Sequence, residues 1–297
     1  METTGKNARQ ELEVVKRRLE REQRQLNVRR FFRSKLAVLG SIIVIVMILT
    51  AILAPVIATA DPLAQTVRAR LTAPGGDYLM GTDKVGRDIF SRIVYGARVS
   101  MIVGVSVGLT SMLLGMIIGL YACYYKRLDN VLMRICDGLS AIPSTLLAIA
   151  LMAVLGQSTF NVILALSIVY TPRMARIARS AALVVKEQTY IEALRSQGAS
   201  NFRIIWRHIA PNILSAVVVQ ASYNFANSII TEAALSFLGV GVPAPQPSWG
   251  NILSEGREVI DKAWWMIVYP GLATALAVMG TNIFGDGLRD ILDPHTN

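Results

Sequence analysis

The sequence predicts an all-α membrane protein with six transmembrane helices and both termini in the cytosol. Hydrophobic residues make up 53% of the 297 residues, and charged residues only 17%. Several uncharged runs approach the roughly 20 residues that a helix needs to cross a bilayer, which soluble domains of this size do not contain. We expect three parts: a basic cytosolic segment at 1–35, a first helix with an external loop at 36–95, and a five-helix core at 96–292.

The positive charge is concentrated at the N-terminus. Residues 1–35 contain eleven Lys or Arg and five Glu, which gives six of the ten excess positive charges. Such a run is compatible with nucleic-acid binding, but it is also typical of the cytosolic flank of a first transmembrane helix. The second interpretation is favoured, so we expect no nucleic-acid partner. Membrane lipid is an expected contact, worth about 1 kcal/mol per basic residue near an anionic surface.

The first span is predicted at residues 36–58, which carry no charge. Ala58-Thr59-Ala60 resembles a signal-peptidase site. The apolar run is nevertheless much longer than the roughly 7–15 residues of a signal peptide's apolar region. We therefore expect a retained helix.

A polar external segment, GTDKVGRDIFSRIVYGARVS, begins at Gly81 and precedes a second span at 99–121. Its basic residues fit the positive-inside pattern poorly, and a structural role is favoured over substrate contact. One apolar face within it predicts a helix lying along the membrane surface: Ile89, Phe90, Ile93 and Val94. The second span contains two GxxxG pairs, which predict close helix packing: Gly104 with Gly108, and Gly115 with Gly119.

The third span is predicted at about 131–155, and the fourth runs from about Phe160 past Pro172. Arg173, Arg176 and Arg179 follow at a spacing of three residues and form a basic face. The positive-inside rule therefore places the next polar segment, 187–211, in the cytosol.

The fifth span, 213–238, has a polar face. Gln220, Asn224, Asn227 and Thr231 share one side of the helix, and Glu232 lies beside them. Polar side chains at this depth need a partner or a watered cavity. Two interpretations stay open: the wall of a translocation path, or a hydrogen-bonded seam between helices worth about 0.6 kcal/mol per contact. Glu232, near the external end, is expected to contact a substrate amine or interfacial water. A sixth span follows at 264–284.

The cytosolic segment 187–211 reads as two short helices separated by Gly198, the second ending at Pro211. Glu192-Ala193-Leu194, then Gly198, then His208-Ile209-Ala210-Pro211 resembles the EAA loop of ABC-importer permeases. Leu194, His208 and Ala210 depart from that pattern. The resemblance implies that the loop docks into a groove of a cytosolic ATPase. The coupling residues would be Glu187, Tyr190, Glu192, Ala193, Leu194, Gly198, Ala199 and Pro211.

Three other segments resemble the dipeptide, oligopeptide and nickel branch of these permeases: the GTDKVGRD segment, AALSFLGVG from Ala233, and GDGLRDILDP from Gly285. The resemblance covers about residues 30–294. It implies the type I importer permease fold in a bacterial inner membrane. The implied partners are a homologous second permease, two cytosolic ABC ATPase domains and an extracytoplasmic substrate-binding protein.

The resemblance implies peptides or glutathione-like peptides as substrates, with nickel complexes as an alternative. The sequence has no phosphate-binding loop, so ATP and Mg are expected on the ATPase partners, and we expect neither a cofactor nor an enzyme activity in this chain. A stand-alone ion-coupled transporter using Glu232 and Asp137 as carriers is the other hypothesis. Co-purification with an ATPase would separate the two.

Overall fold

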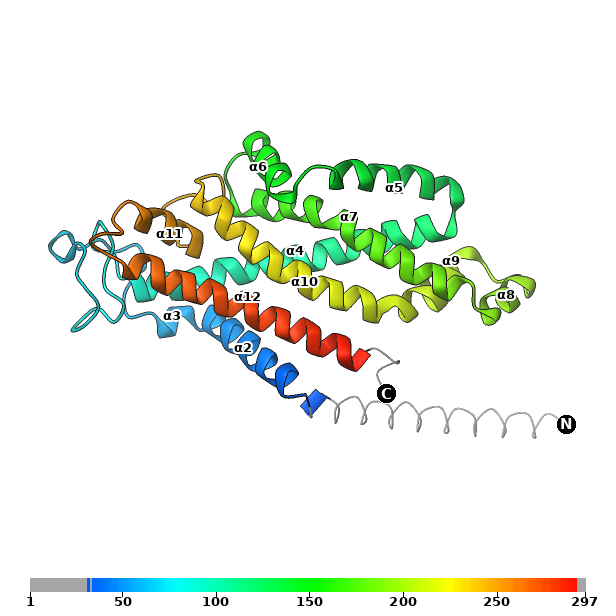
Figure 1. Ribbon diagram of the computed structural model, residues 1–297, viewed down its shortest axis with the longest axis horizontal. Helices are drawn as coiled ribbons and strands as arrows, with labels where there is room; N and C mark the ends of the chain where they lie inside the picture. The colour runs from blue at the N-terminus through cyan, green and yellow to red at the C-terminus, as the bar shows by residue number, and fades with distance from the viewer. Residues whose placement is uncertain (1–30, 33, 293–297) are drawn as a thin grey trace.

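The computed structural model describes residues 31–32 and 34–292, so the predicted basic segment at 1–35 lies almost wholly outside the described part. The described chain is an elongated bundle of helices (Figure 1). Its elements are α2 (Lys35–Ile52), α3 (Ala54–Ile57), η1 (Val67–Ala69), α4 (Ile89–Tyr124), α5 (Lys126–Ser140), α6 (Ser144–Leu155), α7 (Thr159–Lys186), α8 (Thr189–Ser196), α9 (Asn201–Arg203), η2 (Ile204–Ile209), α10 (Ala210–Phe237), α11 (Trp249–Arg257) and α12 (Trp265–Leu292).

Within the described residues, four helical stretches are long and apolar enough to cross a membrane: α2, α4, the α9–η2–α10 stretch, and α12. A fifth span results if α5 and α6 are counted as one broken crossing. The helix α7, which we predicted as the fourth span, is 28 residues long and has Pro172 in its interior. It is not among the four candidate membrane spans because its basic residues lower the mean hydropathy of the helix.

The predicted third span is not one straight helix. Its two halves, α5 and α6, meet at an angle of 92°. The break falls at residues 141–143, where Pro143 fixes its own φ and disfavours helical geometry in the residue before it. The first half is also strongly amphipathic, since α5 alternates charged and apolar residues at helical spacing.

The prediction that a separate helix lies along the membrane surface before the second span is also wrong. Ile89 and Ile93 belong to the first turns of α4, which runs without a break to Tyr124. Asp88 caps this helix, because its carboxylate accepts a hydrogen bond from the backbone N–H of Ser91 at 2.8 Å. The apolar face of these turns packs inward against α11 and α12 instead of lying on a bilayer; Ile89 is completely buried.

The two GxxxG pairs do permit close helix packing, as predicted. A Cβ atom added to Gly119 would lie 2.6 Å from the carbonyl oxygen of Ala175 on α7. One added to Gly104 would lie 2.5 Å from the ring of Phe225 on α10. The first glycine pair of α4 thus packs against α10 and the second against α7. The helix α4 is therefore the central element of the bundle.

The two ends of the bundle differ in content. The short helices α8 and α9 project from one end, here called the α8 end (Figure 1). The loop after α3, η1 and α11 gather at the opposite end, here called the α11 end. The chain enters α2 and leaves α12 on the side of the α8 end, so these two helices run antiparallel along the flank of the bundle.

Candidate functional site

The helix α8 ends in a Schellman motif at Gly198. The N–H of Ala199 donates to the carbonyl of Leu194 at 3.0 Å, and that of Gly198 to Arg195 at 2.9 Å. Gly198 has φ +77°, a conformation that favours glycine. Apart from its two neighbours in the chain, no described residue has an atom within 4 Å of the position of a Cβ there. Backbone geometry therefore requires this glycine, while the space beside it is open.

The predicted coupling residues fall into two groups around this turn. Glu187, Tyr190, Glu192, Ala193 and Gly198 are exposed, whereas Leu194 and Ala199 are half-buried. The buried side of α8 is formed by Ile191, which packs with Leu194 into a cluster that includes Ile204, Ile205 and Ile209. The helix is thus fixed to the bundle by one face and presents the other outward.

Tyr124, the last residue of α4, connects that helix to the segment around α8. Its hydroxyl donates to Oδ1 of Asn201 at 2.7 Å. Its ring faces two cations: Arg195 Cζ lies 5.3 Å and Lys186 Nζ 5.8 Å from the ring centroid. Lys186 Nζ also donates to the carbonyl of Cys123 at 2.7 Å. Four elements, α4, α7, α8 and α9, therefore meet at one aromatic ring, within cation–π range.

The prediction that the second short helix ends at Pro211 is wrong. The chain passes from α9 through the π-helical segment η2 into α10, and residues 201–237 form one continuous helical stretch. Pro211 occupies the first turn of α10 and is exposed. Proline is tolerated there because the hydrogen-bond register changes at this point: the N–H of Ala210 bonds back to Ile205, five residues earlier.

The polar residues of α10 face neighbouring helices in this chain. Gln220 and Asn224 are buried, and Gln220 Nε2 donates to Asn224 Oδ1 at 2.8 Å. Asn224 Nδ2 then donates to the hydroxyl of Ser111 on α4 at 2.9 Å. Thr231 is hydrogen-bonded to the hydroxyl of Tyr170 on α7 at 2.8 Å, and the carbonyl of Asn227 accepts from the same hydroxyl at 3.2 Å. For Gln220, Asn224 and Thr231 these contacts form hydrogen bonds within this chain, as in the second of the two interpretations. That the polar face of α10 lines a translocation path stays a prediction.

Glu232 does not reach interfacial water in this structure, which corrects that expectation. The residue is completely buried. Ser100 of α4 donates to Oε2 at 3.1 Å, and Ser236 donates to Oε1 at 2.8 Å. No ion pair joins Glu232 to a cation in the part of the chain that the structure describes; serine hydroxyls satisfy its carboxyl group, and Ser248 also contacts it.

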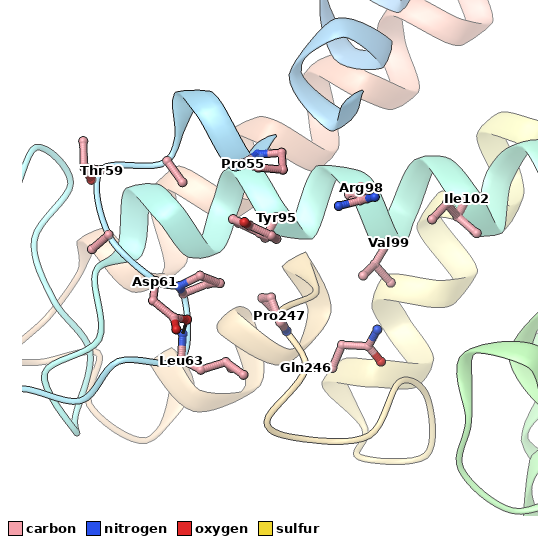
Figure 2. A pocket seen from close by; sticks show the side chains of 13 residues that line it. Pro55, Thr59, Asp61, Leu63, Tyr95, Arg98, Val99, Ile102, Gln246 and Pro247 are labelled. Carbon is pink, nitrogen blue, oxygen red and sulfur yellow. Dashed lines mark hydrogen bonds between the residues drawn. The ribbon is translucent and has the colours of Figure 1, made fainter. Parts of the chain in front are cut away.

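A cavity of about 700 Å³ opens at the α11 end (Figure 2). Three segments line it: residues 55 and 58–63 from α3 and the loop after it, residues 95, 98, 99 and 102 of α4, and residues 246–247 before α11. The lining contains one carboxylate, Asp61, and one guanidinium, Arg98, among proline and aliphatic side chains.

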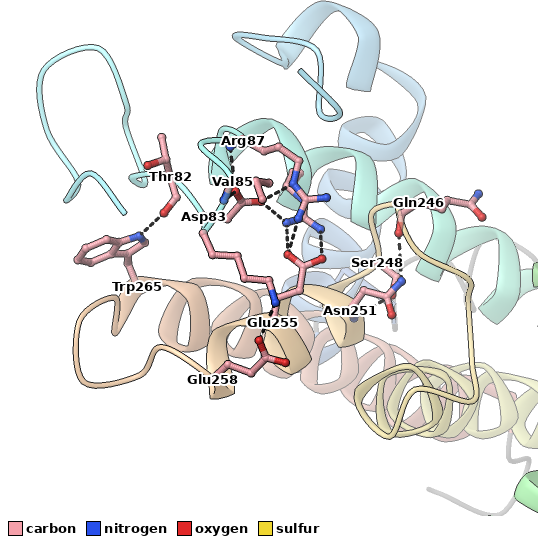
Figure 3. Close-up of polar contacts among 12 residues, drawn as sticks. Thr82, Asp83, Val85, Arg87, Gln246, Ser248, Asn251, Glu255, Glu258 and Trp265 are labelled. Atoms are coloured by element: carbon pink, nitrogen blue, oxygen red, sulfur yellow. Dashed lines mark hydrogen bonds and ion pairs between the residues drawn. The ribbon is translucent and has the colours of Figure 1, made fainter. Parts of the chain in front are cut away.

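The GTDKVGRD segment and the first turn of α4 form a charge cluster with α11, defined here as Asp83, Arg87, Arg92 and Glu255. Figure 3 labels Asp83, Arg87 and Glu255 of this cluster. Arg92 is completely buried; it donates to Asp83 Oδ2 at 2.6 Å and to both oxygens of Glu255 at 2.6 and 3.0 Å. Arg87 bonds the same two carboxylates. Two cations thus meet two anions, which explains how basic residues can gather here without an uncompensated positive charge.

The pKa of Asp83 reflects this setting. Burial alone would raise the pKa of the carboxyl group, but backbone N–H donors from Arg87 and Val85 and the charge of Arg92 together hold it below the ordinary aspartate value. Outside the cluster, Lys84 pairs with Glu258 at 2.6 Å, and Trp265 donates its indole N–H to the carbonyl of Thr82 at 3.0 Å. The segment therefore acts as a brace between α4, α11 and α12.

Two features of the site were not predicted from the sequence. The Tyr124 contact was missed, although three tyrosines within five residues, Tyr121, Tyr124 and Tyr125, mark the end of the second span. Glu255 was missed as the partner of the external arginines, because nothing local in a sequence pairs residues that lie 163 positions apart. Among residues 31–32 and 34–292, no group of three or more His, Cys, Asp or Glu side chains is placed to hold a metal ion.

The sequence matches curated proteins over most of its length. It is 46% identical over 269 residues to a putative peptide transport system permease protein of Brucella suis, covering 91% of each chain. It is 44% identical to the dipeptide transport system permease protein of Alkalihalophilus pseudofirmus, covering 88% of this chain and 86% of that one. With the glutathione transport system permease protein of Pectobacterium atrosepticum it shares 42% identity, over 90% and 89% of the two chains.

The fold is also found among solved structures. A chain of the MetNI methionine ABC transporter, in an inward-facing conformation, superposes with a TM-score of 0.57 at 18% identity, over 68% of this chain and 96% of that one. Residues 23–74 match the profile of the N-terminal transmembrane domain of oligopeptide transport permease C. Residues 111–297 match that of the binding-protein-dependent transport system inner membrane component. The chain therefore belongs to the family of binding-protein-dependent transport system inner membrane components, in its peptide-permease branch.

Proposed function

We propose that this chain is one membrane-spanning subunit of an ATP-driven importer for short peptides in a bacterial inner membrane. The observation that carries the proposal is the seating of α8. Ile191 is completely buried in the bundle, while Glu192 and Ala193 on the same helix are exposed. A helix held by one face and open on the other suits a docking role: a partner that moves its outer face also moves the bundle beneath it.

The α8 end would lie in the cytosol. Lys126, Arg127, Lys186, Arg195 and Arg203 all belong to this end of the bundle, which agrees with the positive-inside rule. At the α11 end, Arg87 and Arg92 are paired with carboxylates. Six crossings and two cytosolic termini would follow if α5–α6 is one broken span and α7 is another.

The ATP and Mg would be bound by two cytosolic ABC ATPase domains, and a homologous second permease would complete the path. An extracytoplasmic binding protein would deliver the substrate to the α11 end. The names of the relatives support peptides, dipeptides or glutathione as the substrate class. The force would enter at Glu192 and reach α4 through the Tyr124 contact.

The test is charge reversal on the exposed face of α8. Glu192→Arg is expected to abolish ATP hydrolysis stimulated by the loaded binding protein, while the chain still inserts into the membrane. The matched control is Lys126→Glu, another exposed charge reversal at the α8 end; it should leave stimulation near the wild-type level. Normal stimulation in Glu192→Arg, or failure of any ATPase to co-purify, would refute the proposal and favour an ion-coupled transporter.

A further inference from the structure

The cavity at the α11 end contains opposite charges that no neighbour neutralises. Arg98 forms no hydrogen bond or ion pair with any residue in the described ranges, and its side chain is exposed. Asp61 uses Oδ1 to accept from the backbone N–H of Leu63 at 2.8 Å, which leaves Oδ2 without a partner in the same ranges. In Figure 2 the ring of Tyr95 is drawn between these two residues.

The depth of Arg98 can be placed along α4. With 36 residues the helix is about 54 Å long, well beyond the roughly 30 Å of a bilayer's hydrocarbon core. Its exposed apolar stripe begins one turn after Arg98 and continues through Ile102, Val105 and Leu109. Arg98 therefore lies at the edge of the apolar zone, where an aqueous ligand can reach the guanidinium.

The walls of the cavity favour a small soluble ligand. Two of them, residues 58–63 and 246–247, are loops beyond the ends of helices, and they contribute the polar side chains of Thr59, Asp61 and Gln246. Pro247 and Val99 are buried and form apolar parts of the cavity wall. A volume of about 700 Å³ falls within the roughly 300–1,000 Å³ typical of small-molecule sites.

We propose that this cavity is an extracytoplasmic binding site for zwitterionic short peptides, in which Arg98 binds the terminal carboxylate and Asp61 the terminal ammonium group. A guanidinium presents paired N–H donors that match a carboxylate. Two further groups can hydrogen-bond to the peptide bond between the termini: the amide nitrogen of Gln246 and the hydroxyl of Tyr95. Neither is bonded to a described residue. The site would receive peptide released at the mouth of the path, so this inference rests on the proposed function.

The experiment uses the importer purified with its partner subunits in nanodiscs, without the separate binding protein. The probe is the dipeptide alanyl-p-benzoyl-phenylalanine, which forms covalent bonds on illumination, and the labelled residues are identified by mass spectrometry. We expect labelling of this chain within residues 58–63 or 95–102, with competition by alanyl-alanine. The same probe with an acetylated N-terminus and an amidated C-terminus should label this chain much less.

Single substitutions assign the two charges. Arg98→Gln and Asp61→Asn are each expected to reduce labelling about tenfold or more, since a hydrogen bond to a charged group contributes about 1.5–3 kcal/mol. Arg68→Gln is the matched control, because Arg68 is an exposed arginine at the α11 end outside the cavity. Equal labelling by the blocked probe, or no change in Arg98→Gln, would overturn the assignment.

A phospholipid headgroup also carries a phosphate and, in phosphatidylethanolamine, an ammonium group. Retention of this lipid by the wild type but not by Arg98→Gln, with no labelling by the dipeptide, would assign the cavity to lipid and overturn the peptide site. The labelling needs no ATP, so its failure is distinct from failure of the proposed function. An importer with normal stimulated ATP hydrolysis and no labelled cavity would lose only this inference.

Discussion

The hydroxyl of Tyr124 lies 2.7 Å from Oδ1 of Asn201 and joins the last residue of α4 to the first residue of α9. Arg195 of α8 covers the same ring. α4 is packed against both α7 and α10 through its glycines. This single contact therefore links the short helices of the α8 end to the centre of the bundle.

Tyr124→Phe is expected to weaken coupling without abolishing it, because the variant loses one hydrogen bond, worth about 0.5–1.5 kcal/mol, and keeps the ring beneath Lys186 and Arg195. Tyr124→Leu should be more severe, since it also removes both cation–π contacts, each worth about 0.5–1 kcal/mol at an exposed site. The measurement is ATP hydrolysis stimulated by the loaded binding protein. Tyr125→Phe is the control, because the hydroxyl of Tyr125 is bonded to no residue in the described chain; an equal loss there would remove the special role of Tyr124.

Gly119→Val is expected to destabilise the protein by about 1–3 kcal/mol, the usual cost of inserting a side chain into a packed interior. The added Cβ would meet the backbone oxygen of Ala175, which cannot move aside like a flexible side chain. The measurement is the thermal unfolding midpoint in detergent. Gly138→Ala on α5 is the control: outside the local turn of its own helix, no described residue lies within 4 Å of its Cβ position, so it should stabilise the helix by up to about 1 kcal/mol. Equal midpoints for the two variants would contradict this packing.

Glu232→Gln is expected to keep both the fold and transport, because the amide retains the shape of the side chain and serine hydroxyls can both donate and accept. Glu232→Ala should cost about 1–3 kcal/mol, since it leaves Ser100 and Ser236 without their acceptor. Peptide uptake by cells and unfolding of the purified protein measure the two effects. Complete loss of uptake in a well-folded Glu232→Gln protein would instead favour the ion-coupled transporter, in which this carboxyl group must titrate.

The charge cluster should make stability depend on pH through Asp83. Its pKa in the folded protein lies below the ordinary value, so the ionised group stabilises the fold above the unfolded pKa of about 3.9. That contribution is lost as the pH falls through the folded pKa. At neutral pH, Asp83→Asn should cost about 3 kcal/mol, because it leaves two buried arginines short of a partner. The unfolding midpoints of variant and wild type should converge in acid.

The control for this pH dependence is Glu258→Gln, which breaks the exposed pair with Lys84. Exposed pairs contribute little, so its midpoint should follow that of the wild type at every pH. A difference between Asp83→Asn and wild type that stays constant down to strongly acid pH would show that the titration of Asp83 does not matter.

Elements set by local chemistry could be predicted from the sequence. The uncharged run of α2, the turn at Gly198 and the two GxxxG pairs depend on residues within a few positions of one another. Some errors came from contacts between residues far apart in sequence, and others from local backbone geometry, such as the break beside Pro143. The first turns of α4 are apolar because α11 and α12 cover them, and Pro211 is accommodated by a change of helical register that composition does not reveal.

The polar row on α10 shows the same limit at the site. Helical spacing put Gln220, Asn224 and Thr231 on one face, yet spacing cannot say what that face meets. Ser111 and Tyr170, which supply the partners, belong to helices far away in the chain. The burial of Glu232 likewise depends on Ser100, which is 132 residues distant.

The unbroken passage from α9 through η2 into α10 has a mechanical consequence. Residues 201–237 form one rod of about 55 Å, at about 1.5 Å per residue. A displacement of Asn201 would be transmitted to Glu232 through helix alone, because no flexible loop lies between the two residues. The π-helical turns of η2 lie near Asn201 and are the place where this helical stretch can change its twist. A rotation there would move Glu232, at the far end of α10, relative to Ser100 of α4.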